Sequence, residues 1–287
     1  MLDSIALEGL KLLPKNLISR AMGAFAQIRW PGPFQVLVNR ISASLLDIDA
    51  DEARRDVDEY RSLNALFTRR LREGTRPIRA ERPGHLTSPV DGRLAEFGEI
   101  DDGRMIQAKG RRYRLAELVD DGRLAGRFEG GKYATLYLSP SDYHRIHAPI
   151  DGRVTSVHHI PGQLFPVNPF AVERVDRLFA INERLISVME TAVGPVGVVK
   201  VGATCVGRIT LTPDGLPPIQ TNQPRQSRRR WDIDDGVELA AGDELGVFNL
   251  GSTVILLLGD DSFRFEPALE RGDSLRFGER LGEWPER

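Results

Sequence analysis

The sequence predicts an α+β protein in which short N-terminal amphipathic helices precede a β-rich domain with a sandwich or barrel-like architecture. Three observations predict it. Residues 1–45 place apolar side chains at helical spacing, and prolines divide them into short segments. From residue 85 onward, short β-type runs alternate with Gly, Asp and Pro turns. A six-residue pattern at 89–94 returns at 149–154, which indicates an internal duplication.

The composition bounds the class of protein. The chain has 287 residues, enough for one large domain and an appendage. Its net charge of −2 gives no whole-chain argument for a nucleic-acid partner. The basic cluster at 225–231 is followed at once by aspartates, which favours a solvated loop over phosphate binding. Cys205 is the only cysteine, which excludes an intramolecular disulfide and a cysteine-based zinc site and fits a reducing compartment.

Residues 1–45 are expected to contact a membrane surface. They carry five basic side chains against two acidic ones, Asp3 and Glu8. No run of 18 residues lacks a charge, and the two acids disrupt the basic start of a signal peptide. We therefore expect helices that lie on an anionic membrane, with Trp30 at the boundary, and do not cross it. Packing on their own domain or on a second subunit is the alternative.

Residues 46–84 are highly charged and are expected to connect the helices to a β-rich catalytic domain at 85–287. Ser62 is placed to cap a short amphipathic helix that Gly74 and Pro77 end. The arginines of this connector are expected on a solvated face.

The β-rich region is inferred from apolar runs bounded by turn residues. Examples are residues 133–138, 153–158, 185–189, 196–201, 206–211 and 253–258. The repeated pattern reads Pro-Val-Asp-Gly-Arg-Leu at 89–94 and Pro-Ile-Asp-Gly-Arg-Val at 149–154, each a turn before a strand. A duplicated β unit would bring both turns to related places in the fold. Chance recurrence of a common turn is the alternative.

Two histidines follow a helix-start pattern. Residues 139–142 read Ser-Pro-Ser-Asp, and the helical turn that they begin would place His144 and His147 on one face. This spacing could contribute to a metal site, but no third ligand motif accompanies the pair, so no metal is expected.

The tripeptide Gly251-Ser252-Thr253 opens the last apolar run. A glycine before a serine leaves no Cβ on the carbonyl side of the peptide bond, so the hydroxyl can approach that carbonyl closely, as self-cleavage requires. A serine needs an imidazole to take its proton and an acid behind the imidazole. The chain offers Asp91, His147 and Ser252 for these roles. The alternative is a tripeptide that only opens a buried strand.

Motifs distributed over nearly the whole chain help to decide between self-cleavage at residue 252 and a tripeptide that only opens a strand. They are residues 60–71, Ser-Pro-Val-Asp-Gly at 88–92, Gln-Ala-Lys-Gly at 107–110, the stretch 137–147 with its Tyr-His-x-x-His pattern, Pro-Gly-Gln-Leu-Phe at 161–165, Phe-Ala-Ile-Asn-Glu-Arg at 179–184, Val-Gly-Ala-Thr at 201–204 and Leu-Gly-Ser-Thr at 250–253. In these motifs the chain resembles the bacterial-type phosphatidylserine decarboxylases, which are pyruvoyl enzymes.

The resemblance implies a maturation step. Asp91 and His147 are expected to activate Ser252, which attacks the carbonyl of Gly251. The amide becomes an ester, and elimination then breaks the chain between residues 251 and 252.

The resemblance also implies the reaction. Cleavage would give residues 1–251 and residues 252–287, whose new amino terminus is a pyruvoyl group made from Ser252. Its ketone is expected to form a Schiff base with phosphatidylserine and to accept the electrons left by departing carbon dioxide, which gives phosphatidylethanolamine. His144 is expected to protonate the carbanion or to hold the substrate.

Two features qualify the assignment of the site. Asp151, in the second copy of the turn, offers a rival acid. Pro166 stands where a hydroxyl residue would contact the substrate phosphate. Substrate binding is therefore expected at Phe165, Val167 and Asn168, with backbone N–H groups near the last two for the phosphate.

The partners and the rival functions complete the expectations. The resemblance implies a homodimer of cleaved two-chain protomers, peripheral to the cytoplasmic side of the cell membrane, without nucleic acid. The first rival is a lipid-binding module that keeps its 251–252 bond. The second is a serine hydrolase, although the Gly-x-Ser-x-Gly elbow is missing. The third is a duplicated β carrier domain modified at one lysine or histidine.

Overall fold

The computed structural model describes residues 9, 13–204, 208–249 and 252–286. Its strands are β1 (His85–Thr87), β2 (Gly92–Glu99), β3 (Arg104–Ala108), β4 (Arg111–Arg114), β5 (Lys132–Tyr137), β6 (Arg145–His147), β7 (Gly152–Ile160), β8 (Arg184–Thr191), β9 (Gly194–Val201), β10 (Arg208–Leu211), β11 (Arg229–Leu239), β12 (Glu244–Asn249), β13 (Thr253–Leu258), β14 (Arg264–Phe265), β15 (Ser274–Leu275) and β16 (Arg280–Glu283). Its helices are α2 (Lys15–Gln27), α3 (Gly32–Leu45), η1 (Val57–Glu59), α4 (Leu63–Phe67), α5 (Leu115–Val119), α6 (Gly122–Gly126), α7 (Pro169–Arg174) and α8 (Leu178–Ile181).

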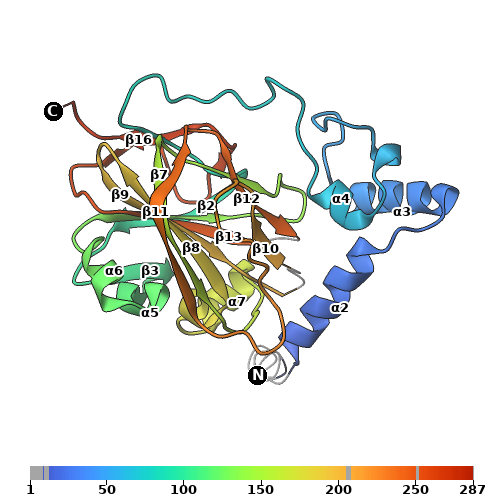
Figure 1. The fold of residues 1–287 in the computed structure, drawn as a ribbon, viewed down its shortest axis with the longest axis horizontal. Helices are drawn as coiled ribbons and strands as arrows, with labels where there is room; N and C mark the ends of the chain where they lie inside the picture. The colour runs from blue at the N-terminus through green and yellow to red at the C-terminus, as the bar shows by residue number, and fades with distance from the viewer. Residues whose placement is uncertain (1–8, 10–12, 205–207, 250–251, 287) are drawn as a thin grey trace.

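The centre of the fold is an open eight-stranded antiparallel sheet of order β11-β7-β8-β9-β13-β5-β2-β15 (Figure 1). Two three-stranded sheets, β1-β16-β14 and β10-β12-β6, share a hydrophobic core with one face of it. The helices α5 to α8 and the β3-β4 hairpin pack on the other core. The α+β prediction is confirmed. Because β11 and β15 are separate edges of the sheet, the layers form a sandwich and not a closed barrel.

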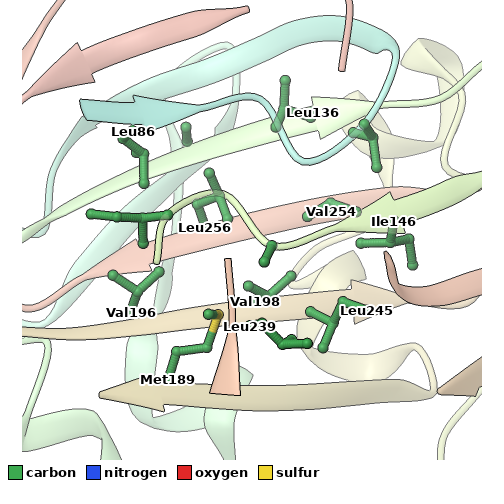
Figure 2. Packing of buried hydrophobic residues seen from close by; sticks show 14 of the residues in the cluster. Leu86, Leu136, Ile146, Met189, Val196, Val198, Leu239, Leu245, Val254 and Leu256 are labelled. Atoms are coloured by element: carbon green, nitrogen blue, oxygen red, sulfur yellow. The ribbon is translucent and has the colours of Figure 1, made fainter. Parts of the chain in front are cut away.

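Both faces of the central strand β13 are buried. Figure 2 shows Val254 and Leu256 among the side chains of the core that includes Leu86 and Ile146 from the small sheets. On the opposite face, Leu257 belongs to the core that the short helices cover. All six residues of β13 are buried, which explains why its sequence is an unbroken apolar run.

Helices α2 and α3 project from the β-rich body (Figure 1). Pro14 precedes α2 and Pro33 lies in the first turn of α3, as the proline pattern predicts. Ten large apolar side chains of this region are exposed: Leu13, Leu17, Met22, Phe25, Ile28, Phe34, Leu37, Ile41, Leu45 and Leu46. In the rest of the described chain, Ile78 is the only other one. Among the described residues, no helix is long and apolar enough to span a membrane.

The connector packs more deeply than its composition predicts. Ser62 caps α4 as expected, since its Oγ accepts a backbone N–H of the first turn at 3.1 Å. The helix ends at Phe67, before the predicted end at Gly74. Arg69 is only 4% exposed, and the side chain of Arg76 is 6% exposed. The prediction of a solvated face is therefore wrong for these two arginines.

The two copies of the Asp-Gly turn occupy equivalent places. The Thr87 N–H donates to the carbonyl of Pro149 at 2.8 Å, and the His147 N–H donates to the carbonyl of Pro89 at 2.8 Å. Each residue of the first bond has its counterpart 60 positions away in the second. The strands that follow, β2 and β7, each begin at the turn glycine and carry an irregularity at the same offset. These bonds are what a duplication of the β unit requires.

A second repeat accompanies the first. The pattern Leu-x-x-Gly-acid-x-Leu-Gly occurs at 239–246 and at 275–282. The Gly242 N–H donates to the carbonyl of Ala148 at 2.9 Å, and the Gly278 N–H donates to the carbonyl of Ser88 at 3.0 Å. Both glycines have positive φ, 91° and 86°, so their turns favour glycine. The residue that precedes each Pro-x-Asp-Gly turn is thus hydrogen-bonded to one of the two glycine turns of the second repeat.

Two local predictions are wrong. The helical turn expected at 139–147 is a tight turn closed by Ser139 and Asp142, whose N–H and carboxylate lie 2.6 Å apart, and the chain then enters β6. Pairing of β6 with β12 overrides the local helix signal. Part of the loop expected at 225–231 is strand β11, because Trp231 packs on the hydrophobic core while the neighbouring arginines stay exposed.

Candidate active site

Ser252 immediately precedes the central strand β13. Its side chain is fully buried, and its Oγ donates to the carbonyl of Val201. Its own carbonyl accepts the Leu138 N–H at 2.9 Å. Since β13 pairs with a strand on each side, residue 252 is held firmly at this point. Gly251, the other half of the expected cleavage site, lies outside the described residues.

A cavity of about 370 Å³ opens beside Ser252, between the N-terminal helices and the β-rich body. Its lining is mostly apolar and includes Met22, Phe25, Leu46, Leu63, Phe67, Tyr137, Pro140, Pro166, Val167, Asn168, Thr204 and Ser252. Three parts of the chain thus build one pocket: the helices, the connector and the strand ends. Such a pocket suits a ligand that brings apolar surface to a polar reacting group.

His147 ends β6 and is buried against two aromatic rings. Its ring stacks on Phe277, with centroids 3.7 Å apart, and on Tyr143 at 5.6 Å. Its Nδ1 lies 2.7 Å from the carbonyl oxygen of Gly242, and its Nε2 lies 3.1 Å from the Tyr143 hydroxyl. A carbonyl only accepts, so Nδ1 carries the proton and Nε2 presents its lone pair. Burial lowers the pKa of His147 to about 4, so the ring is neutral at pH 7.

Asp91 lies in the first Asp-Gly turn and is 7% exposed. Its Oδ1 accepts the Phe277 N–H at 2.7 Å, and its Oδ2 accepts Nη2 of Arg76 at 2.7 Å. Phe277 therefore contacts two of the predicted site residues, Asp91 through its backbone and His147 through its ring. The structure brings these two residues to one place.

Ser252 forms no hydrogen bond with Asp91 or His147 in the part of the chain that the structure describes. Among the described residues, the ring of His147 bonds to Gly242 and Tyr143, and the hydroxyl of Ser252 bonds to Val201. The role of Asp91, His147 and Ser252 as a catalytic group stays a prediction.

His144 precedes β6 and is fully buried. Its Nδ1 lies 2.7 Å from the carbonyl oxygen of Asp142, which places the ring proton there. Its Nε2 is buried and has no hydrogen-bond partner among the described residues. The ring packs on Phe67 of the cavity wall, with centroids 4.0 Å apart. Burial, with a smaller contribution from the charge of Arg69, lowers the pKa of His144 to about 3.

Comparison with known proteins shows which family the chain resembles over nearly its whole length. A family model described as phosphatidylserine decarboxylase matches residues 63–283. A phosphatidylserine decarboxylase proenzyme of Anaeromyxobacter sp. (strain K) is 47% identical over 284 residues, which cover 98% of this chain and 99% of the relative. The chain belongs to the phosphatidylserine decarboxylase family.

Further relatives agree. Phosphatidylserine decarboxylase proenzymes of Myxococcus xanthus (strain DK1622) and Azotobacter vinelandii (strain DJ / ATCC BAA-1303) are 39% identical over 282 residues and 41% identical over 289 residues, each covering 99% of the relative. The activity is therefore decarboxylation of phosphatidylserine, a membrane lipid, by a chain made as a proenzyme. This agrees with the motif analysis and favours a decarboxylase over the lipid-binding module, the hydrolase and the carrier domain.

The rival acid of this decarboxylase, Asp151, lies in different surroundings from Asp91. It is exposed, and its Oδ1 accepts the Ala241 N–H at 2.7 Å, which is the counterpart of the bond from Phe277 to Asp91. Where His147 stands beside Phe277, the second copy has Thr87, whose hydroxyl donates to a backbone carbonyl. These neighbours favour Asp91 as the functional acid.

The residues expected to bind substrate lie at one side of the cavity. Val167 and Asn168 line it. The Asn168 side chain also caps α7 by accepting a backbone N–H at 3.0 Å. Phe165 is buried behind this wall, where Asn182 bonds its backbone N–H and carbonyl at 2.9 Å each and the Lys15 ammonium lies 4.2 Å from its ring. Their contact with substrate stays a prediction.

Sequence reasoning missed four residues of this neighbourhood. They are Arg69, Arg76, Tyr143 and Phe277. Tyr143 could have been identified from the sequence, because it precedes His144 in the motif 143–147. The two arginines and Phe277 carry no local signal, since only the fold shows that they are buried and which residues they contact.

Proposed function

We propose that this decarboxylase cuts itself between Gly251 and Ser252 and that Ser252 becomes the pyruvoyl group of the mature enzyme. The observation that carries the proposal is the position of Ser252. This residue is buried in the cavity wall and immediately precedes the central strand β13. The full-length similarity to decarboxylase proenzymes supports it.

In the first step, Nε2 of His147 takes the hydroxyl proton of Ser252, whose Oγ adds to the Gly251 carbonyl. The C–N bond breaks, the proton passes to the released amine, and the amide becomes an ester. Neutral His147 has the lone pair that this requires, and the Tyr143 hydroxyl, which donates to Nε2, must release it for the step. Asp91, held at the backbone of Phe277, supplies the negative charge that stabilises the imidazolium.

In the second step, residue 252 loses its α-proton and the bond between its Cβ and the ester oxygen breaks. Residues 1–251 leave with a terminal carboxylate, and the dehydroalanine left at 252 takes up water and loses ammonia, which leaves the ketone. The apolar wall beside Ser252 fits such a small uncharged group. When present, the pyruvoyl ketone supplies a sink for the electron pair left by departing carbon dioxide.

His144 is the residue that we assign to proton transfer during turnover. Its Nε2 has a buried lone pair with no partner among the described residues, and its ring touches the cavity wall at Phe67. A neutral imidazole can take a proton from the substrate ammonium and return it to the carbon after carbon dioxide leaves. The phosphate is assigned to backbone N–H groups near Val167 and Asn168, with Phe165 packed behind them.

The test is the intact mass of the purified chain under denaturing conditions. The wild type is expected to give residues 1–251 and residues 252–287, the smaller fragment lighter by one ammonia than its serine form. Ser252→Ala is expected to stay whole. His144→Ala is expected to be cut and to lose about 10²- to 10⁴-fold in decarboxylation rate. A single full-length mass from folded wild type would contradict the proposal, and normal turnover of His144→Ala would contradict its assigned role.

We also propose that α2 and α3 dock on the cytoplasmic surface of the cell membrane, where an anionic surface presents the substrate. The cluster of exposed apolar side chains on these helices supports this. Leu17→Ser combined with Leu37→Ser is expected to reduce co-sedimentation with phosphatidylserine vesicles. Ile78→Ser, which changes an exposed apolar residue outside the helices, is the control. Equal binding of all three proteins would contradict the docking.

The assembly is proposed to be a homodimer of cleaved two-chain protomers, with part of the apolar helix surface serving the partner. Sedimentation velocity in detergent tests this. A species of twice the protomer mass is expected, and a monomer over the whole concentration range would contradict it.

A further inference from the structure

Arg76 is enclosed between two carboxylates. Its Nε lies 3.1 and 3.2 Å from the two Asp91 oxygens, and its Nη2 lies 2.7 Å from Oδ2. On the other side, Nη1 and Nη2 donate to the two oxygens of Glu52 at 3.0 and 2.6 Å. Nη1 also donates to the carbonyl of Thr75 at 3.1 Å. The connector thus reaches into the β-rich domain at the Asp91 carboxylate.

The charges of this cluster support each other. Burial alone would lower the pKa of Arg76, but its hydrogen bonds to Asp91 and Glu52 raise that pKa above the ordinary value. Hydrogen bonding to Arg76 in turn lowers the pKa of Glu52. Arg76 therefore stays charged, and its planar guanidinium fixes the orientation of both carboxylates.

The second copy of the turn shows what this clamp adds. Asp151 accepts the equivalent backbone N–H, from Ala241, but it is exposed and forms no ion pair within the described chain. A backbone N–H is therefore sufficient to shape an Asp-Gly turn. Among the described residues, the arginine is found only at the copy whose aspartate shares its partner Phe277 with His147.

We propose that Arg76 is a positioning residue for maturation: held by Glu52, it fixes the Asp91 carboxylate against Phe277 in the place where it supports His147. The inference rests on the proposed function of Asp91. Arg76 acts through that carboxylate and is not assigned any contact with substrate. Its hydrogen bonds go to Asp91, Glu52 and Thr75, whereas the substrate cavity is lined by other residues.

This assignment separates maturation from turnover. Once the chain is cut, Asp91 has completed its proposed work, so protomers that mature slowly should still decarboxylate at the normal rate. A residue that merely stabilises the fold would lower both quantities together.

The test follows self-cleavage of freshly made chain by intact mass for the wild type, Arg76→Ala, Arg76→Lys and Glu52→Gln. Arg276→Ala is the matched control, because this arginine also lies near Glu52, at 3.3 Å, but its side chain is 60% exposed. Arg76→Ala is expected to cleave about 10- to 100-fold more slowly. Arg76→Lys and Glu52→Gln are expected to lie between it and the wild type, and Arg276→Ala to match the wild type.

Two further readouts distinguish positioning from support of the fold. Guanidinium chloride, well below denaturing concentration, is expected to restore cleavage of Arg76→Ala. The kcat for each cleaved protomer is expected to equal that of the wild type.

Normal cleavage of Arg76→Ala, or slow cleavage without rescue and with an equal loss of kcat, would overturn the proposal. If Arg76→Ala does not fold, slow cleavage of folded Arg76→Lys and Glu52→Gln with normal kcat supports it, and wild-type rates in both overturn it. Failure of the wild type to cleave would instead overturn the proposed function.

Discussion

The two Asp-Gly turns of this decarboxylase have the same backbone but different neighbours. Asp91 and Asp151 each accept a backbone N–H from the equivalent place in a second turn, at Phe277 and Ala241 respectively. Asp91 is buried with Arg76, whereas Asp151 is exposed. The two turns therefore share their backbone geometry and differ in the side chains around the aspartate, and on this difference we base the assignment of Asp91 as the functional acid.

The same contrast holds at the adjacent strands. The residue 60 positions before His147 is Thr87, and both donate their backbone N–H to a proline of the opposite copy. The imidazole stacks on Phe277, but the second copy offers only the small side chain of Ala241 at the corresponding position. The proposed site thus draws on both copies of the repeat, with its acid from one turn and its base from beside the other.

The largest effect is expected when the functional copy is given the residue of its counterpart. His147→Thr removes the base that we propose for Ser252, so self-cleavage should slow by about 10²- to 10⁴-fold. The time course of intact mass measures this. Thr87→Val, the reciprocal control, removes a hydroxyl that bonds a backbone carbonyl and should leave the rate near that of the wild type. Rapid cleavage of His147→Thr would remove the distinction between the copies.

A smaller effect concerns stability and pH. Burial lowers the pKa of His147 to about 4, below its unfolded value near 6.5, so the unfolded chain binds more protons between these limits. The stabilising effect of the neutral ring is complete above pH 6.5 and is lost as the pH falls toward 4. In the uncleaved Ser252→Ala background, His147→Thr should reduce the pH dependence of the free energy of unfolding by up to about 1 kcal/mol per pH unit. Urea unfolding at several pH values measures it, and parallel curves would contradict it.

Much of the fold could be predicted from local sequence. An unbroken apolar run predicted β13, prolines divided the N-terminal helices, and Ser62 capped α4. The 60-residue repeat was visible because its turns keep the same Asp-Gly pair. The 36-residue repeat was missed, although its leucines and glycines recur, because the residues between them differ.

The remainder depended on tertiary structure. The helix signal at 139–147 was overridden because β6 pairs with β12. The burial of Arg69 and Arg76 could not be read from a charged connector, because buried cations require partners that the fold supplies from distant segments. The motifs identified Asp91, His144, His147 and Ser252 as candidate site residues, but only the structure shows which residues each of them contacts.

The most direct experiment compares the self-cleavage half-times of Asp91→Asn and Asp151→Asn with that of the wild type. Both changes keep the shape of the turn and remove one charge from equivalent positions. We predict that Asp91→Asn slows cleavage by about 10²-fold or more, while Asp151→Asn cleaves like the wild type. Equal rates for the two variants, or slow cleavage of Asp151→Asn alone, would contradict the claim that the two copies have separated into a functional and a structural one.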